Sequence, residues 1–189
     1  MLYYKFSKLS DFTDAEIEST FKLLSSEQKG YINSLTPSKQ KQSLCARALL
    51  NLLICEHFKN INLSSLMCSN KSKPYLENSD LYISLTHSED YVGCAVSDYP
   101  VGIDIERIRE VRSEVIKRVC SEEEVGFIKD NSDFFILWTL KEALFKAKDL
   151  KTVKLKELTF VKNGKLFLNE YSVITDEIDG YKWSVVNLI

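Results

Sequence analysis

The chain is poor in residues that interrupt regular structure or bind soft metals. Its 189 residues include six glycines and three prolines, too few for a collagen-like or linker-like stretch. Two histidines and the absence of CxxC spacing argue against a zinc site. The five cysteines are odd in number, so we expect reduced thiols rather than a disulfide framework. No apolar run approaches the roughly 18 residues of a membrane span.

The overall composition is that of a globular protein with a hydrophobic core. Hydrophobic residues make up 44% of the chain and charged residues 28%, and the length of 189 residues allows one large domain or two small lobes. The net charge of -2 argues against general nucleic-acid binding. The first residues run into a charged segment and contain no signal-peptide core. These features predict a cytoplasmic protein with neither a nucleic acid nor a membrane as partner.

The first half of the chain predicts a strand, two helices and then a hairpin. Thr13 and Glu16 form a capping box, and Thr36 followed by Pro37 is a favourable start for a helix that reaches about Phe58. The expected strands cover residues 3–6, 81–85 and 91–96, with a turn at 86–90 and a mostly irregular segment at 60–80.

The second half repeats this order. A strand is expected over 101–106, helices over 113–119, 122–129 and 133–148, and hairpins at Asn163-Gly164 and Asp179-Gly180. This order predicts an α+β fold of two similar lobes, 1–98 and 99–189, each an antiparallel sheet with helices. Because strands and helices do not alternate strictly, a doubly wound parallel sheet is excluded.

Asp104 and Glu106 are the most informative pair of residues. They lie two apart in an alternating run, so a strand would place both side chains on one face. A solvated outer face is the simpler interpretation, because such alternation is common in strands. Gly102, however, would let another group approach the backbone closely. Carboxylates gathered on one face would suit Mg2+, which prefers oxygen ligands.

Glu124 offers a third carboxylate with two competing interpretations. The run from Ser121 to Glu124 has the pattern of a capping box, in which Glu124 would bond the start of its own helix. The local sequence favours this capping role, whereas the wider pattern of acids favours a third metal ligand beside Asp104 and Glu106.

Trp138, Glu142 and Lys146 form one row of the expected long helix. The glutamate and the lysine could be an ordinary surface ion pair worth about 0.3–0.5 kcal/mol. Because a tryptophan is costly to leave in solvent, we expect this row to face a cleft or the other lobe. A lysine there could neutralise a phosphate, and a carboxylate could accept a proton.

Three motifs occur together in the chain: Thr86-His87-Ser88, Gly102-Ile103-Asp104-Ile105-Glu106 and Trp138-x-x-Lys141-Glu142-x-x-x-Lys146. Their order and spacing resemble those of the 4'-phosphopantetheinyl transferases. The chain resembles the longer Sfp-type members, which activate peptide and polyketide synthases, rather than the short trimeric acyl-carrier-protein synthases. The resemblance implies a monomer of two pseudo-symmetric α+β lobes, with coenzyme A bound in the cleft between them.

The resemblance also implies roles for individual residues. Asp104, Glu106 and Glu124 match the metal-binding acids of the family, and Glu142 matches its general base. The implied catalytic group is Glu142, Lys146 and Asp104. The implied coenzyme A contacts are Lys73, Thr86, His87, Lys141 and Lys146, the last of these on the pyrophosphate. Two positions depart from the family: Ser72 stands where a glycine is usual, and Gln42 stands near the place of an arginine.

Together these roles imply transfer of 4'-phosphopantetheine from coenzyme A to a serine of an apo acyl, peptidyl or polyketide carrier protein. Mg2+ would be the cofactor and 3',5'-ADP the leaving group. One alternative is a non-catalytic module that binds coenzyme A or a carrier protein, although the chain keeps the acids that such a module would usually have lost. Another is a different Mg2+-dependent phosphotransferase or nuclease, and the net acidic charge speaks against the nuclease.

Overall fold

The chain divides into two units, Met1–Pro100 and Val101–Ile189, in a computed structural model that describes residues 1–58, 61, 63–67, 73–168 and 171–189. Each unit combines helices with antiparallel sheets, which confirms the predicted α+β class. The division into lobes at 1–98 and 99–189 stays a prediction. Ser72 and Cys68 lie outside the described residues.

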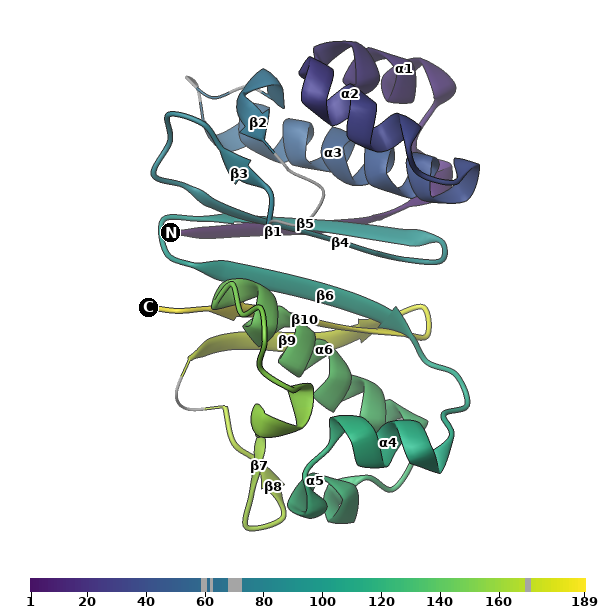
Figure 1. Cartoon of the computed structure of the whole chain (residues 1–189), viewed down its shortest axis with the longest axis vertical. Helices are drawn as coiled ribbons and strands as arrows, with labels where there is room; N and C mark the ends of the chain where they lie inside the picture. The colour runs from purple at the N-terminus through teal and green to yellow at the C-terminus, as the bar shows by residue number, and fades with distance from the viewer. Residues whose placement is uncertain (59–60, 62, 68–72, 169–170) are drawn as a thin grey trace. The chain divides into compact units, whose positions relative to one another are not determined.

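The unit Met1–Pro100 is built on a three-stranded antiparallel sheet in the order β1-β5-β4. Its strands are β1 (Leu2–Lys8), β4 (Tyr82–Ser88) and β5 (Tyr91–Ser97). The long helix α3 (Pro37–His57) crosses one face of this sheet, and α1 (Asp14–Leu23) and α2 (Ser26–Asn33) pack against α3 on the side away from the sheet (Figure 1). The smaller elements are η1 (Leu9–Asp11), η2 (Leu63–Ser65), β2 (Leu66–Met67) and β3 (Tyr75–Leu76).

Local sequence signals set the starts of two of these helices. Thr13 accepts a hydrogen bond from the backbone of Glu16, whose side chain bonds back, so the predicted capping box is present at α1. Pro37 occupies the first turn of α3 as predicted. Helix α2 was not predicted, because its buried side carries the polar Gln28, whose amide oxygen accepts two hydrogen bonds from buried Arg47.

The hairpin between β4 and β5 is tighter than predicted. We expected the turn to span residues 86–90, but β4 continues to Ser88 and only Glu89 and Asp90 separate the two strands. Glu89 has a φ of 45°, which allows the tight reversal. Thr86 and His87 are therefore strand residues, paired with Gly93 and Val92.

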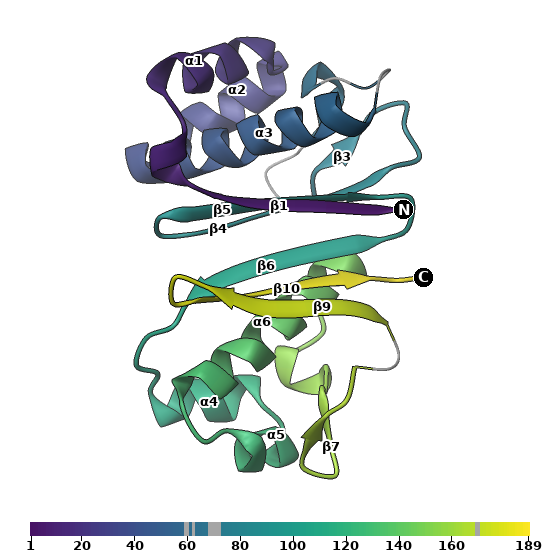
Figure 2. The same ribbon diagram turned by 180° about the vertical axis from the view of Figure 1, so that it is seen from behind.

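The unit Val101–Ile189 repeats the same strand order. Its sheet runs β6-β10-β9, so the first strand of the unit pairs with the last, and the last pairs with the one before it, as in β1-β5-β4. Helix α6 (Asn131–Ala147) lies along one face of this sheet (Figures 1 and 2). The strands are β6 (Val101–Arg107), β9 (Ser172–Ile178) and β10 (Tyr181–Asn187), and the remaining elements are α4 (Ser113–Val119), α5 (Glu122–Phe127), η3 (Leu155–Glu157), β7 (Val161–Lys162) and β8 (Lys165–Leu166).

Gly102 explains how closely α6 approaches the sheet. A Cβ placed on Gly102 would lie 1.8 Å from the carbonyl oxygen of Ala143 and 2.7 Å from the backbone nitrogen of Ala147. The group that approaches this glycine is therefore the backbone of α6 itself. Only a residue without a side chain permits this contact, which holds the C-terminal half of α6 against β6.

Within the described ranges, no helix has the length and apolar character needed to cross a bilayer. Cys45, Cys55, Cys94 and Cys120 are free thiols.

Candidate active site on strand β6 and helix α6

Asp104 and Glu106 lie on the face of β6 that meets α6. Ser184 is the residue opposite Asp104 on β10, and opposite residues of an antiparallel pair point to the same side. The Ser184 hydroxyl lies 2.8 Å from that of Thr139 on α6. Asp104 therefore faces the helix, and Glu106, two residues further along the strand, lies on the same side.

Lys146 joins the helix to the strand at Asp104. Its Nζ donates to Asp104 Oδ1 at 2.7 Å and to the carbonyl oxygen of Ile103 at 3.0 Å. The Asp104 side chain is 8% exposed and that of Lys146 is 28% exposed, so the pair lies at the edge of the core. Strand β6 accepts both hydrogen bonds from the ammonium group, and part of the Lys146 side chain remains exposed to solvent. A cation fixed in this way can still attract a phosphate oxygen.

Glu142 is the third acid associated with this pair. Burial raises the pKa of its carboxyl above the ordinary value of 4.5, and the charges of Asp104 and Glu106 raise it further, against the lowering effect of Lys146. A carboxylate whose pKa moves toward neutrality is a better proton acceptor than an ordinary surface glutamate. The structure thus brings together four predicted residues: Asp104, Glu106, Glu142 and Lys146.

Glu106 lies at the more solvent-exposed end of this face. Its side chain is 23% exposed, and Oε2 lies 3.4 Å from Nη1 of Arg109. Lys182 is its partner across the sheet on β10, and the Lys182 ammonium pairs with Glu177 at 2.8 Å. The acidic face therefore passes from the buried Asp104 to a partly exposed, charged rim.

Trp138 continues the row of Glu142 and Lys146 toward the start of α6. It is partly buried against the hydrophobic core of its own unit, and its ring lies 5.8 Å from that of Phe134, tilted by 47°. The row thus begins in packed apolar surroundings and ends at the Asp104 pair.

Glu124 takes a different place from the one predicted for a metal ligand. Its carboxylate is fully buried: Oε2 accepts hydrogen bonds from the Ser121 backbone at 2.8 Å and from Lys141 Nζ at 2.5 Å, and Oε1 accepts from the Phe160 backbone at 3.0 Å. The capping box predicted at Ser121 is present. Both oxygens are therefore engaged within the protein, and we leave Glu124 out of the proposed ligand set.

Lys141 also differs from its predicted role as a coenzyme A contact. The side chain is fully buried, and its Nζ donates to Glu124, to the carbonyl oxygen of Val119 at 3.0 Å and to that of Leu155 at 3.2 Å. An ammonium group has three donors, and these three acceptors use them all. The Lys141 side chain therefore binds groups inside its own unit rather than a ligand.

No group of three or more His, Cys, Asp or Glu side chains in the described part of the chain is arranged to hold a metal ion. The oxygen donors of Asp104 and Glu106 nevertheless fit the chemistry of Mg2+. Magnesium in phosphate-handling sites is usually held by one or two carboxylates, with phosphate oxygens and waters as its other ligands.

The other predicted contact residues belong to the unit Met1–Pro100. Thr86 is buried in β4 and its neighbour His87 is exposed, as the alternation of a strand requires. Lys73 is partly buried, two residues before β3.

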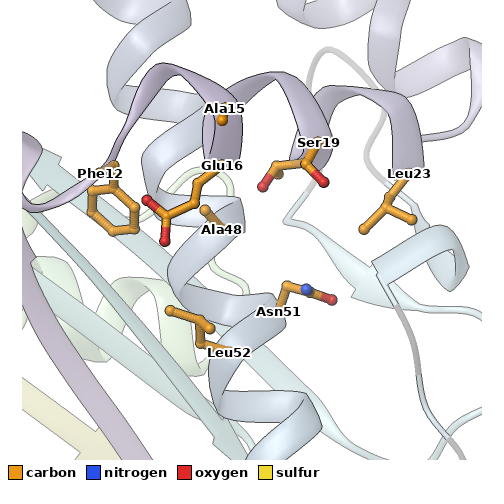
Figure 3. A pocket seen from close by; sticks show the side chains of 9 residues that line it. Phe12, Ala15, Glu16, Ser19, Leu23, Ala48, Asn51 and Leu52 are labelled. Carbon is orange, nitrogen blue, oxygen red and sulfur yellow. The ribbon is translucent and has the colours of Figure 1, made fainter.

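This unit also contains an open cavity of about 280 Å³ between α1 and α3 (Figure 3). Phe12, Leu23 and Leu52 supply much of its apolar lining, and Glu16, Ser19 and Asn51 its polar groups. None of the predicted site residues lines it.

The sequence interpretation missed a chain of hydroxyl groups beside the acidic face, of which Thr139 and Ser184 are buried. Ser184 donates to Thr175 at 3.1 Å and lies 2.8 Å from Thr139, whose hydroxyl also lies 3.0 Å from the carbonyl oxygen of Phe135. These residues tie α6, β10 and β9 together beside Asp104. Isolated serines and threonines give no sequence signal of such a network.

Comparison with known proteins matches the part of the chain that carries this site. The sequence model of the 4'-phosphopantetheinyl transferase superfamily matches residues 100–187. The 4'-phosphopantetheinyl transferase gsp of Aneurinibacillus migulanus is 30% identical over 128 residues, which cover 64% of this chain and 54% of that protein. The 4'-phosphopantetheinyl transferase Sfp of Bacillus subtilis (strain 168) is 34% identical over 73 residues, 35% of this chain and 33% of that protein.

A third relative, the 4'-phosphopantetheinyl transferase psf-1 of Bacillus pumilus, is 38% identical over 71 residues, 34% of this chain and 30% of that protein. The chain thus covers about half of the gsp protein and about a third of the other two. Residues 100–187 are thus similar to the 4'-phosphopantetheinyl transferase superfamily, and the relatives that the chain resembles include Sfp itself.

Proposed function

We propose that this protein transfers the 4'-phosphopantetheine group of coenzyme A to a serine of an apo acyl, peptidyl or polyketide carrier protein. The observation that carries the proposal is the cluster of Asp104, Lys146 and Glu142 on β6 and α6, within the residues that match the superfamily. Relatives named as 4'-phosphopantetheinyl transferases support it.

The reaction is a phosphoryl transfer. The serine oxygen of the carrier protein forms a bond to the pantetheine-side phosphorus, the bond from that phosphorus to the bridging oxygen breaks, and 3',5'-ADP leaves. Such reactions depend mainly on positioning and on stabilising the charge that spreads over the phosphate oxygens. Lys146, anchored by Asp104, supplies fixed positive charge for these oxygens.

Glu142 is the proposed acceptor of the serine proton. Its raised pKa favours proton uptake, and its place beside Lys146 on α6 keeps it near the charge that the lysine stabilises. The same nearness to Asp104 and Glu106 would also suit a third oxygen ligand. Mg2+ affinity separates the two roles: a Glu142→Gln variant should keep its affinity if Glu142 acts only as the base.

Asp104 and Glu106 are the proposed residues for Mg2+. When bound, this ion would add positive charge that orients the pyrophosphate and stabilises the leaving group. Asp104 has a second task, because it holds Lys146 in place. Glu106 stands on the same face at the exposed end, where water can complete the coordination of an ion.

The contacts proposed for the remainder of coenzyme A are Lys73, Thr86 and His87. The resemblance of their motifs carries this part, and each group is chemically suited to phosphate oxygens. A monomer is proposed on the same ground, whereas a cytoplasmic location is proposed from the sequence features, which include no signal-peptide core.

The test of the proposed function is a measurement of 3',5'-ADP release with coenzyme A, Mg2+ and an apo carrier protein, each omitted in turn. We expect release only when all three are present. Release without a carrier protein would identify a different Mg2+-dependent phosphotransferase or hydrolase. Coenzyme A binding without release on any carrier protein of a broad panel would identify a binding module.

A further inference from the structure

We infer that the buried Lys141–Glu124 pair is a positioning device that fixes the rotation of helix α6, and through it the places of Glu142 and Lys146. The kinetic part of this inference rests on the transferase function proposed above. The pair itself touches no substrate.

The pair connects five segments of the unit Val101–Ile189. Lys141 reaches the carbonyl oxygens of Val119 at the end of α4 and Leu155 in η3, as well as Glu124 in α5. Glu124 in turn accepts from the backbone of Phe160, which precedes β7. Both side chains are fully buried, so every polar contact of the pair is made in a region of low dielectric.

Helix α6 therefore has two lysine anchors. Lys141 ties it to α4, α5 and η3, and Lys146 ties it to Asp104 and Ile103 on β6. Five positions on a helix correspond to a turn of about 140° around its axis, so the two anchors lie on different faces. Anchors on two faces resist rotation of a helix about its axis more strongly than one anchor does, and they add to the Thr139–Ser184 contact that also holds α6 to the sheet.

Glu142 lies between these anchors in the sequence. It follows Lys141 directly and precedes Lys146 by one helical turn. A rotation of α6 would carry Glu142 away from Asp104 and Glu106, whose negative charges raise the pKa of its carboxyl. Because a misplacement of about 1 Å can cost about 100-fold in rate, such a rotation would be visible in turnover.

A buried ion pair is weak evidence for stability, since apolar residues of similar volume often stabilise as well. This property separates the positioning role from a merely structural one. The double variant Lys141→Met/Glu124→Gln removes the ion pair, keeps the volume of the lysine and retains a glutamine that can complete the capping box. It should stay folded while α6 loses one of its two lysine anchors.

The two tryptophans of the chain provide a readout that does not depend on activity. Trp138 lies on α6 in the row of Glu142 and Lys146, whereas Trp183 lies on β10 opposite Ile105. The protein labelled with 15N-tryptophan would show one indole N–H signal for each. In the double variant we expect the Trp138 signal to shift and the Trp183 signal to stay.

The kinetic measurement compares the double variant with Val161→Ala. Val161 lies in β7 and is buried in the hydrophobic cluster that also contains the apolar residues of α6. Its truncation therefore destabilises the unit without removing Lys141 or Lys146. Well below the melting temperatures of both variants, we expect kcat to fall about 100-fold in the double variant, with KM for coenzyme A within about twofold of wild type. Val161→Ala should retain wild-type kcat.

An unmoved Trp138 signal in the folded double variant overturns the inference, whatever the kinetics. A shifted Trp138 signal with wild-type kcat overturns its catalytic part. If the wild-type protein releases no 3',5'-ADP on any carrier protein, the proposed function fails, and the Trp138 signal alone then decides whether the pair positions α6.

Discussion

Lys146 donates a hydrogen bond to Asp104 at 2.7 Å, although the two residues are 42 positions apart in the sequence. The pair links the strand that carries the acidic residues to the helix that carries the proposed base. Its two side chains are 8% and 28% exposed, so the ion pair is better shielded from solvent than an ordinary surface pair. Asp104 thus neutralises the lysine in the resting protein while keeping it beside the acidic face.

Replacement of Asp104 should remove this organisation without disturbing the sheet. In Asp104→Asn the side chain keeps its shape, and Lys146 retains the carbonyl oxygen of Ile103 as an acceptor. We expect Mg2+-dependent transfer to fall by at least about 100-fold, measured as 3',5'-ADP release. The exposed Glu110→Gln is the control for loss of one acidic charge and should retain activity. Full activity of Asp104→Asn would remove Asp104 from the site.

Replacement of Glu142 should separate catalysis from binding. In Glu142→Gln we expect kcat to fall about 100-fold or more, because the proposed proton acceptor is lost, while coenzyme A affinity changes little. The measurements are single-turnover kinetics and calorimetric titration with coenzyme A. Equal losses of rate and affinity would instead assign Glu142 to substrate binding.

The raised pKa of Glu142 also predicts how stability depends on pH. In the folded protein this carboxyl holds its proton to higher pH than in the unfolded chain, where its pKa has the ordinary value of 4.5. At pH values between 4.5 and the folded pKa, the folded state therefore binds more protons than the unfolded state. The stability that protonated Glu142 contributes is lost as the pH rises through the folded pKa. Relative to Glu142→Gln, the wild type should lose free energy of unfolding across this window and then level off.

Urea unfolding at a series of pH values measures this difference, since groups that titrate alike in both proteins cancel. A wild type that gains stability relative to Glu142→Gln as the pH rises would contradict the predicted direction.

The contact between Gly102 and α6 predicts opposite effects for two glycine substitutions. Gly102→Ala places a methyl group against backbone atoms of Ala143 and Ala147, so we expect a loss of about 3 kcal/mol in the free energy of unfolding. At Gly126 in α5, an added methyl group would meet nothing within 4 Å. Gly126→Ala should therefore gain about 0.5–1 kcal/mol. Chemical denaturation tests both, and a Gly102→Ala variant as stable as wild type would show that α6 can move off β6.

Cysteine reactivity should follow burial. Burial raises the pKa of Cys45 and Cys120 to about 11 and that of Cys94 to about 12, whereas Cys55 is exposed. Among these four thiols we expect iodoacetamide at about pH 8 to modify Cys55 alone in the native protein, because thiolate is the reactive form. Peptide mapping before and after denaturation measures this, and rapid native labelling of Cys94 would contradict the packing of β5.

Short-range patterns predicted much of the fold because their physical causes are local. The capping boxes at Thr13 and Ser121 satisfy backbone donors within four residues, so the sequence alone reveals them. The shared face of Asp104 and Glu106 likewise follows from the period of a strand. Helix α2 escaped prediction because its buried polar residue, Gln28, is compensated by Arg47, 19 positions away.

The site residues show where local patterns stop being informative. The spacing of Glu124 from Ser121 is the same whether this glutamate caps its helix or binds a metal ion. Its buried partner Lys141, 17 positions away, distinguishes the two roles, and the sequence does not reveal this contact. Nothing in the sequence indicates that Lys141 points into the core while Lys146 reaches β6. These choices depend on how α6 packs against several segments that are distant in the chain.

The most direct test of the account is intact-mass spectrometry of an apo acyl carrier protein and an apo peptidyl carrier protein, each incubated with this protein, coenzyme A and Mg2+. The account predicts a mass gain equal to one phosphopantetheine group on at least one carrier protein, abolished by EDTA and strongly reduced in Asp104→Asn. A gain that persists unchanged in Asp104→Asn, or no gain on any carrier protein of a broad panel, would contradict it.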